Sequence, residues 1–395
     1  MKIEKPLITI SVIIVVILAI VLIEYQKPQE NQITQQTKEQ TVQTNQNNNT
    51  QNQKEIKSNT EQISPEIKQI IKEKEKNYKQ APKFKGIEHW INSPELTMQE
   101  LKGKVVLIDF WTYSCINCLR TLPYLKQWDN KYKNAGLIII GVHTPEFDFE
   151  KKYENVVAAA QKYELKFAIA QDNNFLTWYA YQNRYWPHKF LIDIDGFIVY
   201  EHIGEGNYEE TEQVIQQLLK ERLKRLQLKQ ELNTTITAPN NIQTIDMQQS
   251  LTPEIYFGYK FYRGNFGNEQ GLIPEESINY TIPKKTEQNN AYFTGTWLNK
   301  PDYMELISDS GEILLPYQAK AVNIVAEAES QTQITVLKDE SLVNQANKGT
   351  DLSENSTTII KDSKLYNLIY AQNYSKNTIK IKATKGFRIF TFTFG

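Results

Sequence analysis

Two cysteines, the only ones among 395 residues, stand three positions apart directly after an apolar run. The run Val105–Phe110 has the length and composition of a buried strand, and Cys115 follows five residues after its end, with Cys118 three residues further on. A pair with this spacing between a strand and a helix is typical of thiol–disulfide exchange. Because the chain holds no other cysteine, the two sulfurs can pair only with each other or with a partner protein.

The position of each cysteine predicts its role. Cys115 is expected at the N-terminus of a helix, where partial positive charge stabilises a thiolate, so we predict that it is the nucleophile and has a depressed pKa. Cys118 is expected one turn further along the helix, within reach of a mixed disulfide. We therefore predict that Cys118 is buried, less acidic than Cys115, and resolves that intermediate.

A carboxylate precedes the cysteine pair inside the apolar run. Asp109 lies six residues before Cys115 and is flanked by Ile108 and Phe110. Burial disfavours the charged form of a carboxyl group and raises its pKa, so Asp109 is a candidate proton acceptor for Cys118. The alternative is an Asp at the end of a strand, solvated and without a role.

The N-terminus carries the pattern of a membrane anchor. Residues 6–23 contain no charge and are mostly Ile, Val and Leu, a run just long enough to span a bilayer, and two lysines precede it. A cleaved signal peptide would have a shorter core and small residues after it. We predict an anchor over residues 1–25, then a Gln/Asn-rich disordered tether over residues 26–82 that ends in a short helix, with the bulk of the chain in the periplasm or outside the cell.

Two folded domains are expected after the tether. Residues 83–229 alternate between strand-like and helix-like stretches, which predicts an α/β sheet. The expected strands are 105–110, 136–142, 167–170, 189–194 and 197–202, with helices from 115, 153, 174 and 208. After a polar linker at 230–251, residues 252–395 show many short strands and no helix, which predicts an all-β sandwich or jelly roll that folds independently.

Further residues carry a resemblance to a known family. Pro123 lies inside the helix that the cysteines open, and Trp186-Pro187 precedes an expected strand. With Asp109 and the Trp111–Cys118 segment, these residues resemble the thioredoxin fold, specifically the TlpA-like domain at the C-terminal end of DipZ proteins. The all-β part is similar to the carbohydrate-module-like domain that follows in that family.

The resemblance implies roles for single residues. Cys115 would attack, Cys118 would resolve and Asp109 would relay a proton. Pro187 would be the cis-proline beside the disulfide, and Trp186, Pro187 and Trp111 would contact the substrate.

The resemblance also implies partners. The substrates would be protein disulfides, and no cofactor is needed beyond the cysteine pair. DipZ proteins carry a multi-helix electron-conducting membrane domain, whereas this chain shows one apolar segment. Its electrons would therefore come from a membrane donor of the CcdA/DsbD type. The all-β part is a candidate for binding cell-wall carbohydrate.

Other functions remain open or are excluded. A thiol peroxidase of the peroxiredoxin type is an alternative because Thr112 lies three residues before Cys115, although residue 108 is Ile where that family has Pro. A non-catalytic binding protein that uses the β-domain is another. Leu119 follows the pair where covalent haem attachment needs His. A net charge of −1 gives no basic footprint for nucleic acid.

Overall fold

The computed structural model describes residues 65–240, 243, 245–246, 248–249 and 251–395. The expected anchor at residues 6–23 and most of the tether lie outside these residues. No helix among the described residues is long and apolar enough to cross a bilayer. The chain divides into two compact units, residues 1–73 and 74–395, and both sheets belong to the second unit.

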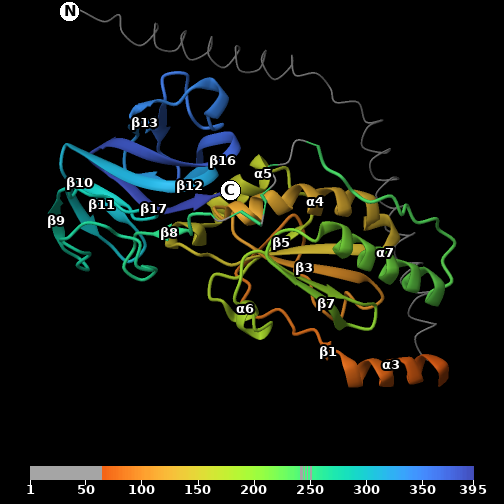
Figure 1. Cartoon of the computed structure of the whole chain (residues 1–395). Helices are drawn as coiled ribbons and strands as arrows, with labels where there is room; N and C mark the ends of the chain where they lie inside the picture. Colours follow the sequence, from red (N-terminus) through yellow and green to blue (C-terminus); the bar gives the residue numbers. More distant parts are fainter. Residues whose placement is uncertain (1–64, 241–242, 244, 247, 250) are drawn as a thin grey trace, which may run out of the picture. The chain divides into compact units, whose positions relative to one another are not determined.

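The first sheet is mixed and contains seven strands. Its spatial order is β1-β7-β6-β3-β4-β5-β2, with β3 parallel to β4 and antiparallel to β6. The strands are β1 (Lys79–Gln80), β2 (His89–Ile91), β3 (Val105–Trp111), β4 (Leu137–His143), β5 (Ala168–Gln171), β6 (His188–Ile192) and β7 (Phe197–Ile203). All seven residues of β3 are buried, as expected for a central strand that is covered on both faces. The cysteine pair thus follows the central strand (Figure 1).

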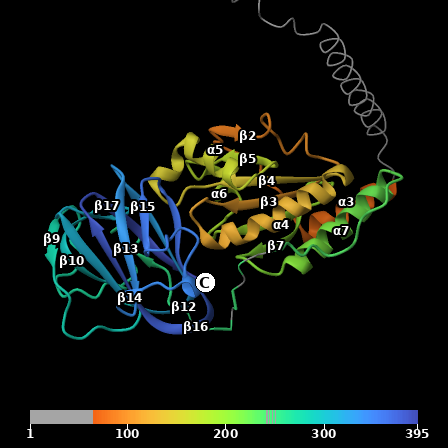
Figure 2. The same cartoon turned by 90° about the horizontal axis from the view of Figure 1, so that it is seen from above.

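Two helices cover one face of this sheet. They are α4 (Ile116–Tyr132) and α7 (Tyr208–Arg225), which run side by side in Figure 2. The rings of Tyr124 and Tyr208 stack at 3.6 Å, and the Tyr132 hydroxyl donates to Glu212 Oε1 at 2.7 Å. Pro123 lies inside α4, and the helix continues to Tyr132 as the sequence predicts.

The opposite face packs against a separate apolar cluster. Side chains of a strand alternate between faces, so Val106 and Ile108 lie in this cluster, whereas Val105 and Leu107 face α4 and α7. The short helix α6 (Leu176–Ala180) contributes to this second cluster, and α5 (Tyr153–Lys162) to the first. Asp109 lies on the same face of β3 as Val105 and Leu107, because side chains two residues apart in a strand share a face. This face is turned toward α4, the helix that carries Cys118.

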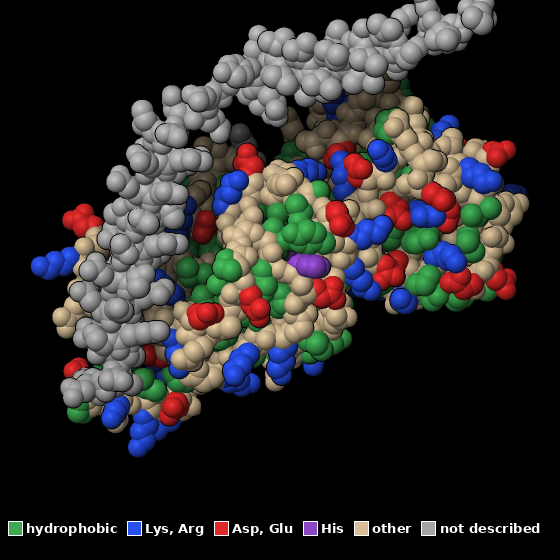
Figure 3. Space-filling view, turned by 180° about the vertical axis from the view of Figure 1, so that it is seen from behind, with side chains coloured by type: hydrophobic (Ala, Val, Ile, Leu, Met, Phe, Trp, Pro, Cys, Tyr) green, Lys and Arg blue, Asp and Glu red, His purple; other side chains and the backbone are tan. Residues whose placement is uncertain are grey.

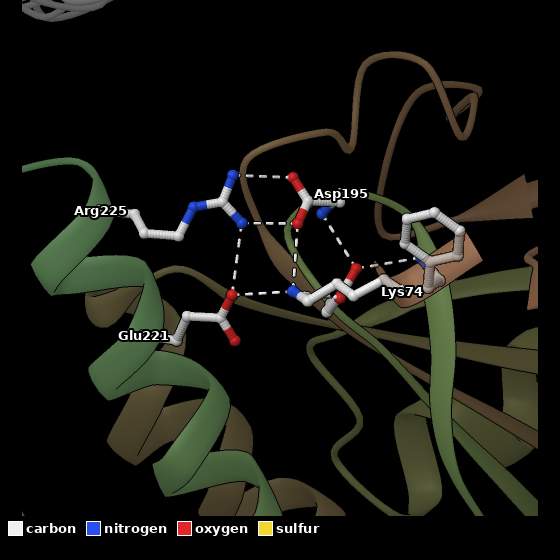
Figure 4. Close-up of polar contacts among 6 residues, drawn as sticks. Lys74, Asp195, Glu221 and Arg225 are labelled. Atoms are coloured by element: carbon white, nitrogen blue, oxygen red, sulfur yellow. Dashed lines mark hydrogen bonds and ion pairs between the residues drawn. The ribbon is translucent and has the colours of Figure 1, made fainter. Parts of the chain in front are cut away.

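An ion cluster fixes the point where the chain enters this sheet (Figure 4). Lys74, in helix α3 (Pro65–Asn77), lies 2.8 Å from a carboxylate oxygen of Asp193, 3.1 Å from Asp195 and 2.8 Å from Glu221. Arg225 of α7 lies 2.5 Å from Asp195. Burial lowers the pKa of Lys74, but the hydrogen bonds that Lys74 donates to these carboxylates outweigh that effect and raise it. The cluster joins the turn between β6 and β7 to α7.

Most of the α/β elements expected from the sequence are present. Each of the five expected strands overlaps an observed strand from β3 to β7, and β6 and β7 pair antiparallel across Asp195-Gly196. The short helix at the end of the tether is α3. The tether prediction is wrong at its end, because Lys79–Gln80 form β1 against β7 instead of staying disordered.

The expected linker is also partly docked. Thr237 donates through its backbone N–H and its hydroxyl to Glu212 of α7, at 2.6 and 2.8 Å. The carbonyl oxygen of Thr234 accepts from Gln216 at 3.2 Å. Polar composition predicted a linker here, and part of it binds α7 through these polar groups.

The second sheet contains ten strands from residue 255 to residue 394. Its main order is β14-β13-β16-β12-β10-β11-β17-β8; β9 also pairs with β10, β15 with β13 and β17 with β12. The strands are β8 (Ile255–Tyr256), β9 (Ser277–Tyr280), β10 (Tyr292–Asn299), β11 (Met304–Leu306), β12 (Ser310–Ala328), β13 (Thr332–Lys338), β14 (Ser341–Leu342), β15 (Thr357–Ile360), β16 (Lys364–Thr384) and β17 (Phe387–Phe394). A β-rich domain thus follows the α/β domain.

Two strands are much longer than the sequence predicts. β12 has 19 residues and β16 has 21, where we expected short strands at 321–328, 365–371 and 378–383. Residues 372–377 are polar and mostly exposed, which suggested a turn. The pairing with β12 moves from Ala319 with Ser375 to Ala321 with Tyr370, so residues 371–374 form a bulge in β16 where we expected a turn, while residues 375–377 stay paired.

Most aromatic residues of the β-rich domain pack inside it. Of the aromatics considered as candidate sugar contacts, Phe257, Tyr292 and Trp297 are at most 2% exposed, and Tyr262 is 44% exposed. Burial of these rings supports the interpretation that they are core residues rather than a binding face.

One apolar cluster crosses from the α/β domain into the β-rich domain. It contains Cys118 and Phe149 together with Tyr256 and Phe390. The Phe390 ring lies 4.8 Å from Phe149 and 5.1 Å from Phe147. The expectation that the β-rich domain is an independent module is therefore wrong in one respect, because its side chains complete a core shared with the α/β domain.

We expect Phe390→Ala to destabilise the protein by about 3 kcal/mol, because it removes a buried aromatic ring from this shared core. Urea unfolding followed by fluorescence would measure the change. Ile359→Ala, at a side chain that is 45% exposed, is the matched control and should cost far less. Equal effects of the two substitutions would show that the shared cluster adds nothing to stability.

The surface mixes charges of both signs. In the uncovered part of the face in Figure 3, Lys and Arg side chains alternate with Asp and Glu, and hydrophobic atoms lie between them. This face therefore offers no extended patch of one sign.

Candidate active site

The two cysteines lie at the start of α4. Cys115 is the N-cap residue, with φ −80° and ψ 113°, and its sulfur accepts the backbone N–H of Cys118 at 3.2 Å. Both cysteines are free thiols; Cys115 is partly exposed and Cys118 is buried, as predicted. The arrangement presents one sulfur for attack and holds the second one turn behind it.

The predicted acidity of Cys115 needs correction. Burial raises the pKa of the Cys115 thiol above its ordinary value, and the charges of Glu254 and Glu146 raise it further. Hydrogen bonding from Cys118 lowers that pKa but does not compensate. Burial raises the pKa of Cys118 well above its ordinary value. Thus the prediction of a depressed pKa at Cys115 is wrong, first because burial of the thiol disfavours its thiolate and second because Glu254 and Glu146, which the motif does not reveal, add negative charge.

Asp109 is buried and faces a lysine that the sequence analysis missed. Asp109 is 1% exposed, and its neighbour across β3 and β6 is Lys189, which is fully buried. Burial raises the pKa of Asp109 to about 7, and the Lys189 charge limits that rise. The Asp109 charge in turn raises the pKa of Cys118. A carboxyl group that titrates near neutral pH beside Cys118 can accept its proton.

The charged end of the Lys189 side chain has few polar partners. Its Nζ donates to the carbonyl oxygen of Gly204 at 3.1 Å and lies 5.8 Å from the centre of the Tyr208 ring. Burial lowers the pKa of Lys189, whereas the charges of Asp109 and Cys118 oppose the shift. The sequence feature that could have revealed Lys189 is its position in the expected strand 189–194, which is mostly apolar.

The predicted cis bond is present between Trp186 and Pro187. The Trp186 indole N–H donates to the carbonyl oxygen of Thr144 at 3.1 Å, and its ring lies 4.3 Å from Trp178. Trp186 stays partly exposed, and both it and Cys115 pack against the same apolar cluster. Trp186 therefore remains available as a substrate contact.

Trp111 does not have the predicted role. It is fully buried, and its ring packs edge-on against His143 at 5.3 Å. A side chain without exposed surface cannot contact a substrate, so the prediction that Trp111 binds substrate is wrong. Trp111 lies on the same face of β3 as Val105 and Leu107, which is turned into the core. Its closeness in sequence to the cysteine motif did not show this.

A glutamate that the sequence analysis missed ties the cysteine loop to the loop after β4. Glu150 is fully buried; its Oε1 accepts the Ser114 hydroxyl at 2.5 Å, and its Oε2 accepts the backbone N–H groups of Glu146 and Phe147 at 2.6 and 3.1 Å. Burial raises the pKa of Glu150, but its donors oppose the shift and favour the carboxylate. Glu150 thus positions Glu146 relative to Ser114, the neighbour of Cys115.

The fold and the site define a thioredoxin-like dithiol protein: a cysteine pair caps the helix after the central strand, with a buried aspartate behind it and a cis-proline loop. Two family models match the chain. The one described as the AhpC/TSA family covers residues 78–201, and the one described as a thioredoxin like C-terminal domain covers residues 252–395.

Curated relatives agree with this class. The chain is 36% identical to protein DipZ of Mycobacterium bovis over 320 residues, 80% of this chain and 43% of that protein. It is 33% identical to the thiol-disulfide oxidoreductase ResA of Bacillus cereus over 147 residues, 37% of this chain and 81% of that protein. A solved structure of a thioredoxin-like protein in the oxidised form shares 25% identity over 36% of this chain and 97% of its own, with a TM-score of 0.34.

The chain therefore belongs to the thioredoxin-like thiol–disulfide oxidoreductases, and its two domains follow one another as in DipZ. It spans less than half the length of the DipZ relatives.

Proposed function

We propose that this protein is a membrane-anchored, extracytoplasmic thiol–disulfide reductase. The observation that carries the proposal is the geometry of the pair: Cys115 caps α4, partly exposed, while Cys118 is buried behind it with Asp109 and Lys189. An attacking thiol at the surface and a resolving thiol beside a proton acceptor match the two steps of disulfide reduction.

The raised pKa of Cys115 supports the reducing direction. Strong oxidants of this kind stabilise their reduced form through an acidic thiolate. Here burial, Glu254 and Glu146 disfavour that thiolate, so the dithiol gains no such stabilisation. The pair accordingly tends to give electrons to a substrate disulfide rather than to take them.

The test is to trap the substrate. In cells, a Cys118→Ser variant of the full chain should accumulate mixed disulfides at Cys115, because the resolving thiol is absent. Non-reducing gels and mass spectrometry of the attached proteins would identify the substrates. Cys115→Ser is the matched control and should trap nothing. Equal capture by both variants would contradict the proposal.

The anchor and the electron donor are part of the same proposal. The uncharged run at residues 6–23 supports a single membrane-spanning segment, with two lysines before it on the cytoplasmic side. A separate membrane protein of the CcdA/DsbD type would then reduce the pair again after each turnover. The substrates would be protein disulfides outside the cytoplasm.

A role in carbohydrate binding is proposed only for the β-rich domain. We assign it a jelly-roll sandwich of the carbohydrate-module-like type, which would direct the enzyme to cell-wall glycan; similarity of fold alone does not establish a ligand. Among its aromatics, exposed Tyr262 is the available sugar contact.

Peroxide reduction is a second candidate, favoured by the match to the AhpC/TSA family model. The Thr112 side chain is fully buried and its hydroxyl lies 3.3 Å from His143 Nε2. A single-turnover assay with hydrogen peroxide would distinguish the two activities, since a peroxidase consumes peroxide much faster than it reduces disulfides.

A further inference from the structure

A tyrosine of the β-rich domain bridges two glutamates near Cys115. The Tyr256 hydroxyl lies 2.7 Å from Glu146 Oε1, on the loop after β4, and 3.2 Å from Glu254 Oε2, on its own domain. Tyr256 is 5% exposed and belongs to the cluster shared by the two domains. The two carboxyl groups are partly exposed and can therefore meet a bound substrate.

The hydrogen count of this bridge favours a shared proton. A tyrosine hydroxyl carries one hydrogen, so Tyr256 can donate to one carboxylate only. Its second contact is a hydrogen bond only if the other carboxyl group is protonated and donates to the tyrosine oxygen. The bridge therefore favours one proton held between Glu146 and Glu254.

The electrostatics agree with that count. Burial and the charges of Glu254 and Glu150 raise the pKa of Glu146 to about 8, while the Tyr256 hydrogen bond and Arg263 oppose the rise. Burial raises the pKa of Glu254. Two carboxyl groups that share a site ionise in two separate steps, so the pair keeps one proton at neutral pH.

The pair acts on the attacking cysteine. The charges of Glu254 and Glu146 both bear on Cys115. Cys118, Arg120 and Lys189 also interact electrostatically with this thiol. Arg120 is committed to Glu205 at 2.7 Å, and Lys189 lies with Asp109 behind Cys118. The Glu146–Glu254 pair is thus the protonated acidic group that interacts with the attacking thiol, whereas Asp109 interacts with Cys118.

We propose that the Glu146–Glu254 pair, bridged by Tyr256, is the general acid that protonates the substrate thiolate released when Cys115 attacks. The inference rests on the proposed reductase function and extends it: the β-rich domain supplies part of the catalytic site.

The step balances as follows for a substrate R–S–S–R′. The Cys115 thiolate, having lost its proton to solvent, forms a bond to one sulfur and the S–S bond breaks, so R′–S⁻ leaves. The pair gives its proton to R′–S⁻ and regains one from water. Cys118 then transfers its proton to Asp109 and its thiolate attacks the Cys115 sulfur; the bond from Cys115 to R–S breaks, and the leaving R–S⁻ takes up the proton from Asp109, which restores the carboxylate. One disulfide is reduced to two thiols while the cysteine pair is oxidised.

The test compares two disulfides in single-turnover reactions of the reduced full chain. Oxidised glutathione releases a weakly acidic thiol that benefits from a proton donor, whereas dithiobis(nitrobenzoic acid) releases an acidic thiol that does not. Glu146→Gln and Glu254→Gln should each slow the reaction with oxidised glutathione by on the order of 10²-fold. Their reaction with the aromatic disulfide should slow far less, because its leaving thiolate needs no proton donor and each variant keeps one carboxylate, the charge that the singly protonated pair carries at neutral pH.

The aromatic disulfide also reports on folding, since its reaction needs an intact Cys115 site. Tyr256→Phe keeps both carboxyl groups and should give a smaller loss of the same selectivity. Glu340→Gln, whose carboxylate pairs with Lys380 in the β-rich domain, is the matched control and should match the wild type with both disulfides. Equal slowing of both disulfides, or of neither, would overturn the inference. A wild-type protein that reduces neither disulfide would overturn the proposed function instead.

Discussion

Cys115→Ser is expected to abolish disulfide reduction, down to the rate of the uncatalysed exchange. Cys115 is the sulfur that is partly exposed at the start of α4, and Cys118 is buried behind it. The chain has no third cysteine that could replace the nucleophile. Reduction of insulin by the full chain with a chemical electron donor would measure the effect.

The matched variant Cys118→Ser should behave differently. It keeps the attacking thiol, so it should still react once with a disulfide and then stop at the mixed disulfide. A circular dichroism spectrum equal to that of the wild type would confirm the fold of both variants. Turnover by Cys115→Ser would show that the chemistry proposed for this pair is wrong.

Local sequence patterns were sufficient to predict the cysteine site. The run Val105–Phe110 placed a buried strand before the pair, and the spacing of Cys115 and Cys118 placed them on the first turn of a helix. Asp109 was expected to be buried because its neighbours in sequence are apolar. These features depend on residues close together in the chain, where periodicity and spacing are informative.

The residues that adjust this site could not be found in the same way. Lys189 meets Asp109 only through the pairing of β6 with β3, about 80 residues apart. Glu254 and Tyr256 reach the site from the other domain, about 140 residues from Cys115. No periodicity connects such segments, and the burial that most raises the pKa of Cys115 also arises only when the chain has packed, so the acidity of Cys115 was predicted in the wrong direction.

The β-rich domain shows the same limit. The polar run at 372–377 predicted a turn between two short strands. Instead β16 runs on through a bulge at residues 371–374, with paired backbone on both sides of it, at Ser375 with Ala319 and at Tyr370 with Ala321. Composition reports which side chains meet water, whereas backbone pairing depends on a partner strand that lies elsewhere in the chain.

Asp109→Asn is expected to slow the second step of the reaction and to stabilise the fold. The amide cannot accept the Cys118 proton, so resolution of a mixed disulfide near neutral pH should slow by about 10²-fold. Stopped-flow measurement of thiol release after Cys115 has been loaded with a substrate would report this step. Without this proton acceptor, any residual rate should rise with pH only as Cys118 itself ionises. The charge of Lys189 stays buried in the variant.

The effect of Asp109 on stability has a defined sign. Its folded-state pKa of about 7 exceeds the ordinary 3.8, so the folded state binds more protons between these values and the free energy of unfolding falls as pH rises through them. At about 1.4 kcal/mol per pKa unit, Asp109→Asn should be more stable than the wild type above pH 7 by up to about 4 kcal/mol. The gain should vanish below pH 4, where the wild-type carboxyl group is protonated in both states. Urea unfolding at pH 4 and pH 8 measures this, with exposed Asp148→Asn as the control; equal stability of wild type and Asp109→Asn at pH 8 would mean that Lys189 compensates the buried charge fully.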